Sequence, residues 1–118
     1  MQVNFSSNSS ILIDYWRLGA MPGVKRGLYG GKLTNENVTM EHLQPASKGG
    51  RRALYNIALA TKENNSFRND SPLKDFLTIH QAEDYLKQFK GIKLPDFNGD
   101  VYIERVRETI KRCFRKNQ

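Results

Sequence analysis

Apolar residues at helical spacing predict helices at both ends of the chain. Residues 11–18 are dense in apolar side chains, and the two preceding serines can cap a short helix there, although a strand would also suit so short a run. Beyond Pro72, spacing of i, i+3 and i+4 predicts a helix that begins at once, followed by a second that opens at 81–83. A last helix spans about 101–115. Its apolar stripe consists of Ile103, Val106, Ile110 and Cys113 or Phe114.

The middle of the chain predicts a β-hairpin followed by a helix. Residues 38–43 alternate imperfectly between apolar and polar side chains, as a half-buried strand does, and Pro45 ends that strand. A Gly-rich basic loop follows, and residues 54–60 form a second apolar run that can pair with the first. Thr61 is placed to cap a short helix over 62–69. Together with the terminal helices, this order predicts an α+β fold.

Composition and charge describe one small folded domain that attracts polyanions. The 118 residues are 38% hydrophobic and 10% aromatic, which is typical of a folded chain of single-domain length. The 19 lysines and arginines exceed the 12 acidic residues, so the net charge is +7. A basic surface attracts nucleic acid because neutralising phosphates supplies most of the non-specific affinity. The alternative is a basic protein with no such partner.

The cysteine count and the hydropathy pattern exclude several classes of protein. Cys113 is the one cysteine, so no disulfide forms within the chain and no thiolate-rich zinc site is possible. We expect it to be a buried small hydrophobe. No apolar run approaches the roughly 20 residues that span a bilayer, and residues 1–10 lack the pattern of a secretory signal. A cytoplasmic location and no membrane contact are therefore expected.

Four polar residues in the middle of the chain carry the candidate chemistry: Glu41, His42, Asn56 and Asn65. A neutral histidine is the natural general base for activating water at physiological pH. Carboxylate and amide oxygens are the ligands that Mg²⁺ prefers. Because a strand alternates its faces, Glu41 and His42 reach one site only if the chain bends, which Pro45 and the loop would allow. The set matches the needs of metal-dependent phosphodiester hydrolysis.

The order and spacing of these residues resemble the HNH nuclease motif of the ββα-metal fold, which is also the HNH domain of CRISPR effector nucleases. The usual motif is Asp-His, a gap, Asn, and then Asn or His nine positions later. Here Asn56 and Asn65 are nine positions apart. The resemblance covers about residues 28–70 and implies a ββα core there. The flanks carry no family signal, and the apolar pattern alone predicts an N-terminal helical arm over 1–27 and a helical C-terminal extension over 71–118.

The resemblance implies a role for each motif residue. Glu41 and Asn65 would hold one divalent metal ion, Mg²⁺ with Mn²⁺ able to replace it. His42 would activate the attacking water, and Asn56 would hold the two strands and the loop together. Asn69 is a further candidate ligand because it lies one turn beyond Asn65 on the same helix face.

Basic residues near the motif are predicted to contact nucleic acid. Arg68 lies in the same predicted helix as Asn65, and a guanidinium matches a phosphate bidentately. Lys48, Arg51 and Arg52 lie in the loop between the strands, where they can contact the DNA backbone. The loop has no Walker spacing, so a P-loop is rejected. His80 is isolated and is predicted to be a surface residue.

The chain departs from the usual motif in two ways. Glu41 stands where Asp is commoner, which retains the oxygen ligand but adds a methylene. Many members also carry two Cys-x-x-Cys pairs that hold a structural zinc, whereas here Tyr29-Gly30-Gly31 stands where one pair would start. We therefore expect no structural zinc, and stability must come from packing of the flanking helices.

The resemblance implies an endonuclease of bacterial or phage type that acts on double-stranded DNA, with RNA as an open alternative. A non-catalytic basic module that binds nucleic acid or regulates another protein, built on the same scaffold, accounts for the +7 charge equally well. A third hypothesis is a toxin-like subunit whose helices dock a partner protein.

Overall fold

A two-stranded antiparallel hairpin lies at the centre of the structure, a computed structural model that describes residues 9–115. Strand β1 (Val38–His42) pairs with β2 (Ile57–Thr61) in a regular register that runs from Val38 opposite Thr61 to His42 opposite Ile57. All five residues of β2 are buried, so this strand is apolar on both faces rather than alternating. The hairpin and the helices around it confirm the predicted α+β class.

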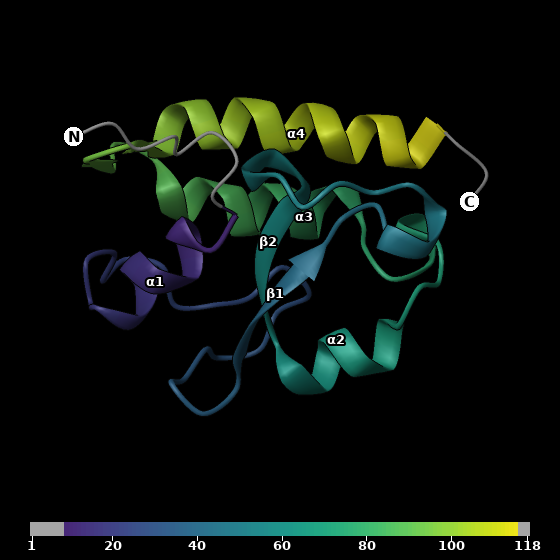
Figure 1. Cartoon of the computed structure of the whole chain (residues 1–118), viewed down its shortest axis with the longest axis horizontal. Coiled ribbons are helices and arrows are strands. Elements are labelled where there is room, and N and C mark those ends of the chain that lie inside the picture. Colours follow the sequence, from purple (N-terminus) through teal and green to yellow (C-terminus); the bar gives the residue numbers. More distant parts are fainter. Residues whose placement is uncertain (1–8, 116–118) are drawn as a thin grey trace.

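Helix α2 (Lys62–Arg68) follows β2 without a connecting loop. Thr61 ends the strand and caps the helix, because its Oγ1 accepts a hydrogen bond from the Asn64 backbone N–H at 3.2 Å. The predicted cap and the predicted helix over 62–69 are therefore confirmed. Figure 1 shows α2 on one side of the hairpin and the pair α3 and α4 on the other.

The remaining α-helices pack around the hairpin and supply ten of the 24 buried residues in the hydrophobic core of the described chain. The apolar run over residues 11–18, which suited either a helix or a strand, forms helix α1 (Ile11–Arg17). The first turn of this helix is buried. Helix α3 (Ile79–Leu86) is capped by Thr78 in a capping box, and α4 (Gly99–Arg115) is the longest helix of residues 9–115. Among the helices of this part of the chain, none is long and apolar enough to cross a membrane.

Two buried tyrosines join α3 and α4 to the hairpin. The Tyr85 hydroxyl of α3 accepts a hydrogen bond from the Leu59 backbone N–H at 2.9 Å, and the Tyr102 hydroxyl of α4 donates to the Ile57 carbonyl at 2.7 Å. The two hydroxyls are 3.0 Å apart. Both tyrosines are at most 2% exposed, so these bonds satisfy polar groups that water does not reach.

Several predicted segments take a different form in the structure. The helix predicted just after Pro72 is a single 3₁₀ turn, η3 (Leu73–Asp75). The segment before α4 contains a second small hairpin, β3 (Lys93–Leu94) with β4 (Phe97–Asn98). The start of the second apolar run is a 3₁₀ turn, η2 (Leu54–Asn56). Short 3₁₀ turns also occur at η1 (Ala46–Lys48) and η4 (Lys87–Phe89). Periodicity over so few residues does not separate these forms.

Two predictions about single residues are confirmed by burial. Cys113 is buried in the core, on the apolar face of α4. His80 is a surface residue, with 88% of its side chain exposed, and lies 3.5 Å from the Asp84 carboxylate one turn along α3.

Candidate active site beside the end of the hairpin

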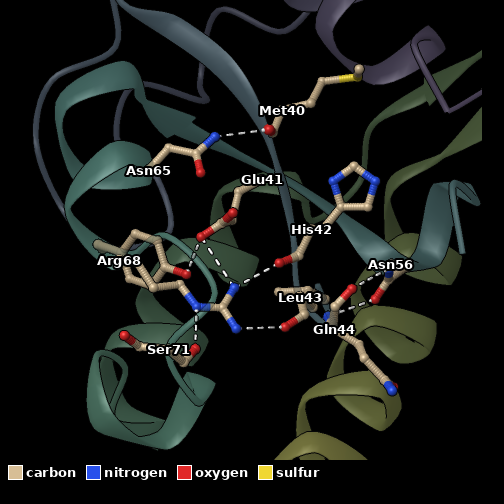
Figure 2. Close-up of polar contacts among 10 residues, drawn as sticks. Met40, Glu41, His42, Leu43, Gln44, Asn56, Asn65, Arg68 and Ser71 are labelled. Atoms are coloured by element: carbon tan, nitrogen blue, oxygen red, sulfur yellow. Dashed lines mark hydrogen bonds and ion pairs between the residues drawn. The ribbon is translucent and has the colours of Figure 1, made fainter. Parts of the chain in front are cut away.

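Glu41 and His42, the last two residues of β1, lie on opposite sides of the strand (Figure 2). The strand stays regularly paired with β2 through His42, so the bend that was predicted to bring the two residues together is not there. Both residues nevertheless line one cleft of about 250 Å³.

The cleft lies between β1, the start of the loop after Pro45 and the end of α2. The polar residues around it are Glu41, His42, Ser47, Asn65, Asn69 and Asp70. A second polar hollow of about 490 Å³ adjoins it, shares Asn65 and Asn69, and is also lined by Lys62 of α2. The structure therefore brings together three of the four motif residues. Asn56 does not line the cleft.

Glu41 is buried, with 3% of its surface exposed, and is held by two donors. The Arg68 guanidinium donates to its Oε2 at 3.2 Å, and the Tyr29 hydroxyl donates a short hydrogen bond to the same oxygen. Burial raises the pKa of the Glu41 carboxyl, while the bonds from Tyr29 and Arg68 act in the opposite direction. Neither of these side-chain donors is on Oε1.

Arg68 is fully buried, which corrects its predicted role as a phosphate contact. Besides Glu41, its guanidinium donates to the carbonyl oxygens of His42 at 2.7 Å, Leu43 at 3.0 Å and Ser71 at 2.9 Å. A guanidinium has five N–H donors and no acceptor, and the four acceptors of Arg68 all belong to the protein. Arg68 therefore ties α2 to the end of β1, as Figure 2 shows.

Asn65 faces β1 across the cleft. Its Nδ2 donates to the Met40 carbonyl at 3.0 Å, which fixes the amide so that its oxygen lies on the side of the Glu41 carboxylate (Figure 2). One carboxylate and one amide oxygen suit a hard cation that keeps water and substrate phosphate as its other ligands. Residues 9–115 contain no group of three His, Cys, Asp or Glu side chains that could hold a metal ion. The oxygen pair is thus compatible with the minimal metal site predicted for Glu41 and Asn65.

Asn56 clamps the loop between the two strands. Its Oδ1 accepts from the Gln44 backbone N–H at 2.9 Å, and its Nδ2 donates to the carbonyls of Gln44 at 3.1 Å and Arg51 at 2.8 Å. Its own carbonyl accepts from the Leu43 N–H at 2.8 Å. All these bonds are to backbone, so Asn56 has the contacts of a structural residue, in keeping with the role predicted for it.

His42 is half-buried, and two arginines act on its charge. Burial, together with the positive charges of Arg52 and Arg68, lowers the pKa of its imidazole below the ordinary value of 6.5. At neutral pH the ring is therefore uncharged and able to accept a proton. Arg68 also donates a hydrogen bond to the His42 carbonyl at 2.7 Å, so one of the two arginines that lower the pKa of the ring also holds the His42 backbone.

The three basic residues of the loop between β1 and β2 are exposed and do not line the cleft. Lys48 ends the 3₁₀ turn η1, and Arg51 and Arg52 follow it. The Arg52 Nε donates to the Ser9 hydroxyl at 3.1 Å, which holds this side chain near His42. All three side chains are exposed, and their contact with nucleic acid stays a prediction.

Sequence reasoning missed two residues of the site. Tyr29 lies outside the helices and strands and contacts Glu41, which is twelve positions farther along in β1, so no local pattern identifies it. Asp70 lines the cleft and accepts a hydrogen bond from the Ser47 hydroxyl at 3.2 Å, which joins the end of α2 to the loop. Asn69, which precedes Asp70, also lines the cleft. Its backbone φ is +55°, a strained conformation for a residue with a side chain.

The chain matches no protein-family model, no curated protein and no solved structure.

Replacing Arg68 should be far more damaging than replacing an exposed arginine. Arg68→Met leaves the Glu41 carboxylate buried without its cation, which should lower the free energy of unfolding by about 3–5 kcal/mol. Arg51→Met, at an exposed position, should change it by no more than about 0.5 kcal/mol. Urea unfolding followed by circular dichroism measures both. Equal stability of the two variants would refute the structural role of Arg68.

Arg52 should lower the pKa of the His42 imidazole. An NMR titration of the ring should place this pKa below 6.5, and Arg52→Gln should move it upward because one positive charge is removed. Arg51→Gln is the matched control and should leave it unchanged, because Arg51 is not among the groups that act on His42. An identical titration in both variants would show that Arg52 does not act on the ring.

Proposed function

We propose that this protein is a metal-dependent endonuclease of the HNH type that hydrolyses phosphodiester bonds in DNA. The observation that carries the proposal is the cleft at which β1 and α2 meet. A histidine whose pKa is lowered and a pair of oxygen ligands, from Glu41 and Asn65, line the same 250 Å³ space. This is the combination that hydrolysis of a phosphodiester requires: a general base for water and a place for a hard cation.

His42 is the general base in this mechanism. One of its imidazole nitrogens accepts a proton from water as the water oxygen attacks phosphorus, and the bond from phosphorus to the 3′ oxygen breaks. The leaving oxygen then takes a proton from solvent. Burial, together with the charges of Arg52 and Arg68, lowers the pKa of the imidazole and so favours its uncharged form at neutral pH, which can accept a proton directly.

Glu41 and Asn65 would hold the metal ion. Arg68 and Tyr29 both bind Oε2 of Glu41 and so orient the carboxylate, while Met40 orients the Asn65 amide through its carbonyl. When bound there, Mg²⁺ supplies polarisation of the scissile phosphate and stabilisation of the leaving 3′ oxygen. Side chains that hydrogen bonds already orient lose less conformational freedom when they bind an ion.

The charge of the surface supports DNA as the substrate. The chain has a net charge of +7, and Lys48, Arg51 and Arg52 are exposed around the cleft. Cations at these positions can neutralise phosphates on either side of the bond that is cut. Lys62 extends the positive charge along the adjoining polar hollow.

One observation favours a second candidate function, a non-catalytic module that binds nucleic acid. The Glu41 carboxylate is already neutralised by the buried Arg68 guanidinium, and Glu stands where the motif usually has Asp. In this alternative, the ion pair replaces the metal as the partner of the carboxylate. The same basic surface would then bind DNA without cutting it.

Removing His42 should abolish cleavage and spare binding. His42→Ala should slow the nicking of supercoiled plasmid in Mg²⁺ by about 10²–10⁴-fold, the usual contribution of a general base. His80→Ala removes the only other histidine of the chain, at an exposed position, and should cut at the wild-type rate. EDTA should stop both active proteins. Cleavage by His42→Ala at the wild-type rate would refute the mechanism.

Asn65 should contribute to metal affinity independently of activity. In isothermal titration with Mn²⁺, Asn65→Ala should bind the ion at least about tenfold more weakly. Loss of a residue that only orients a metal ligand costs about 10–100-fold in affinity, and this substitution would remove one of the two ligands. Asn64→Ala, the neighbour on α2, does not line the cleft and should bind as the wild type does. Absence of any Mn²⁺ binding to the wild type, with DNA present, would favour the non-catalytic alternative.

A further inference from the structure

A groove of about 490 Å³ lies between the end of α1 and the segment that leads to β1, away from the cleft. Its floor includes Met21 and Leu33, which are 2% and 5% exposed. Trp16 forms part of its wall and is fixed there, because its Nε1 donates to the Val24 carbonyl at 2.7 Å. An apolar hollow with an immobilised aromatic ring is a feature that neither the hairpin nor the proposed reaction requires.

Cations surround this apolar floor. Arg17, Lys25 and Lys32 line the groove and are exposed, and no acidic residue of the described chain lines it. An occupant that complements the groove has an apolar, stackable part and negative charge beside it. A nucleotide has both, since its base can stack on an aromatic ring while its phosphate meets arginine or lysine. The volume is within the range of about 300–1,000 Å³ found for small-molecule sites.

The groove is connected to the candidate active site by one turn of the chain. Residues 26–32 form this turn, closed by an antiparallel bridge between Arg26 and Lys32. Its tip lies against the start of α2, since a Cβ at Gly31 would be 3.3 Å from Thr61 Cγ2. Farther along, the Lys62 N–H donates to the Asn37 carbonyl at 2.6 Å, and Lys62 lines the polar hollow that adjoins the cleft. Lys25 and Lys32 therefore line the groove on one side of the turn, and Lys62 lines the polar hollow on the other.

We propose that this groove binds an unpaired nucleotide of the nucleic acid whose backbone continues past Lys62 into the cleft. The bases of an intact duplex are stacked inside the helix and do not reach an apolar floor, whereas the bases of a single strand do. The substrate is therefore DNA with an unpaired segment beside the bond that is cut. This inference rests on the proposed function only for the identity of the polymer and the direction of its path.

The single tryptophan of the chain makes the groove directly observable. Tryptophan fluorescence of the full chain is titrated in EDTA, at fixed salt, with an oligothymidylate and with a duplex of the same phosphate concentration. The oligothymidylate should quench Trp16 and the duplex should not. Polyglutamate, an acidic polymer without bases, should also leave the emission unchanged. Equal quenching by the duplex or by polyglutamate would overturn the proposal.

Charge variants test the groove without disturbing Trp16, which packs against the core. Lys25→Ala/Lys32→Ala should weaken the oligothymidylate titration by at least about fivefold, because two phosphate contacts are lost. Lys111→Ala/Arg115→Ala removes the same charge from the far end of α4, which lies at the opposite end of the molecule (Figure 1), and should bind within about twofold of wild type. An equal loss in both double variants would overturn the proposal.

The fluorescence titration tests the groove, and the plasmid assay tests the proposed endonuclease activity, so either proposal can be refuted without the other. If oligothymidylate quenches Trp16 but no DNA is cut in Mg²⁺, the groove stands and the proposed endonuclease activity falls. If plasmid is cut but oligothymidylate does not quench Trp16, the activity stands and the groove proposal falls.

Discussion

The buried guanidinium of Arg68 is the contact on which the geometry of the site depends. It joins the Glu41 carboxylate, two carbonyls at the end of β1 and the Ser71 carbonyl beyond α2. A fully buried charge is tolerated only when it is paired and its donors are satisfied, so small displacements of α2 against β1 are costly. The residues that line the cleft, from both of these elements, are therefore held in one arrangement.

The other side of the hairpin is held as firmly. Tyr85 and Tyr102 bond to the backbone of β2 from α3 and α4, and Asn56 closes the loop between the strands through four backbone bonds. Packing and buried hydrogen bonds therefore hold the hairpin on both sides. A site supported from both sides of its strands suits the base and the two ligands of the proposed function.

Positive charge would have two effects in the proposed function. Together with burial, Arg52 and Arg68 lower the pKa of the His42 imidazole, and the exposed arginines and lysines would attract phosphates. Arg68 contributes only to the first effect because it is buried, whereas Arg52 is exposed and could contribute to both. Under the proposal, binding and base chemistry are for this reason linked through residues of the loop and of α2.

The sequence by itself determined the hairpin, the helix after it and the four-residue motif, because caps, strand runs and nine-residue spacing are local properties. Tertiary structure decided the rest. In the folded chain Arg68 is buried against Glu41, and Tyr29 contacts the same carboxylate. Glu41 and His42 line one cleft although β1 does not bend. Tertiary structure also shortened the helix after Pro72 to a single 3₁₀ turn. Whether a polar side chain faces solvent or the interior depends on which elements pack against it, and that is set by contacts distant in the sequence.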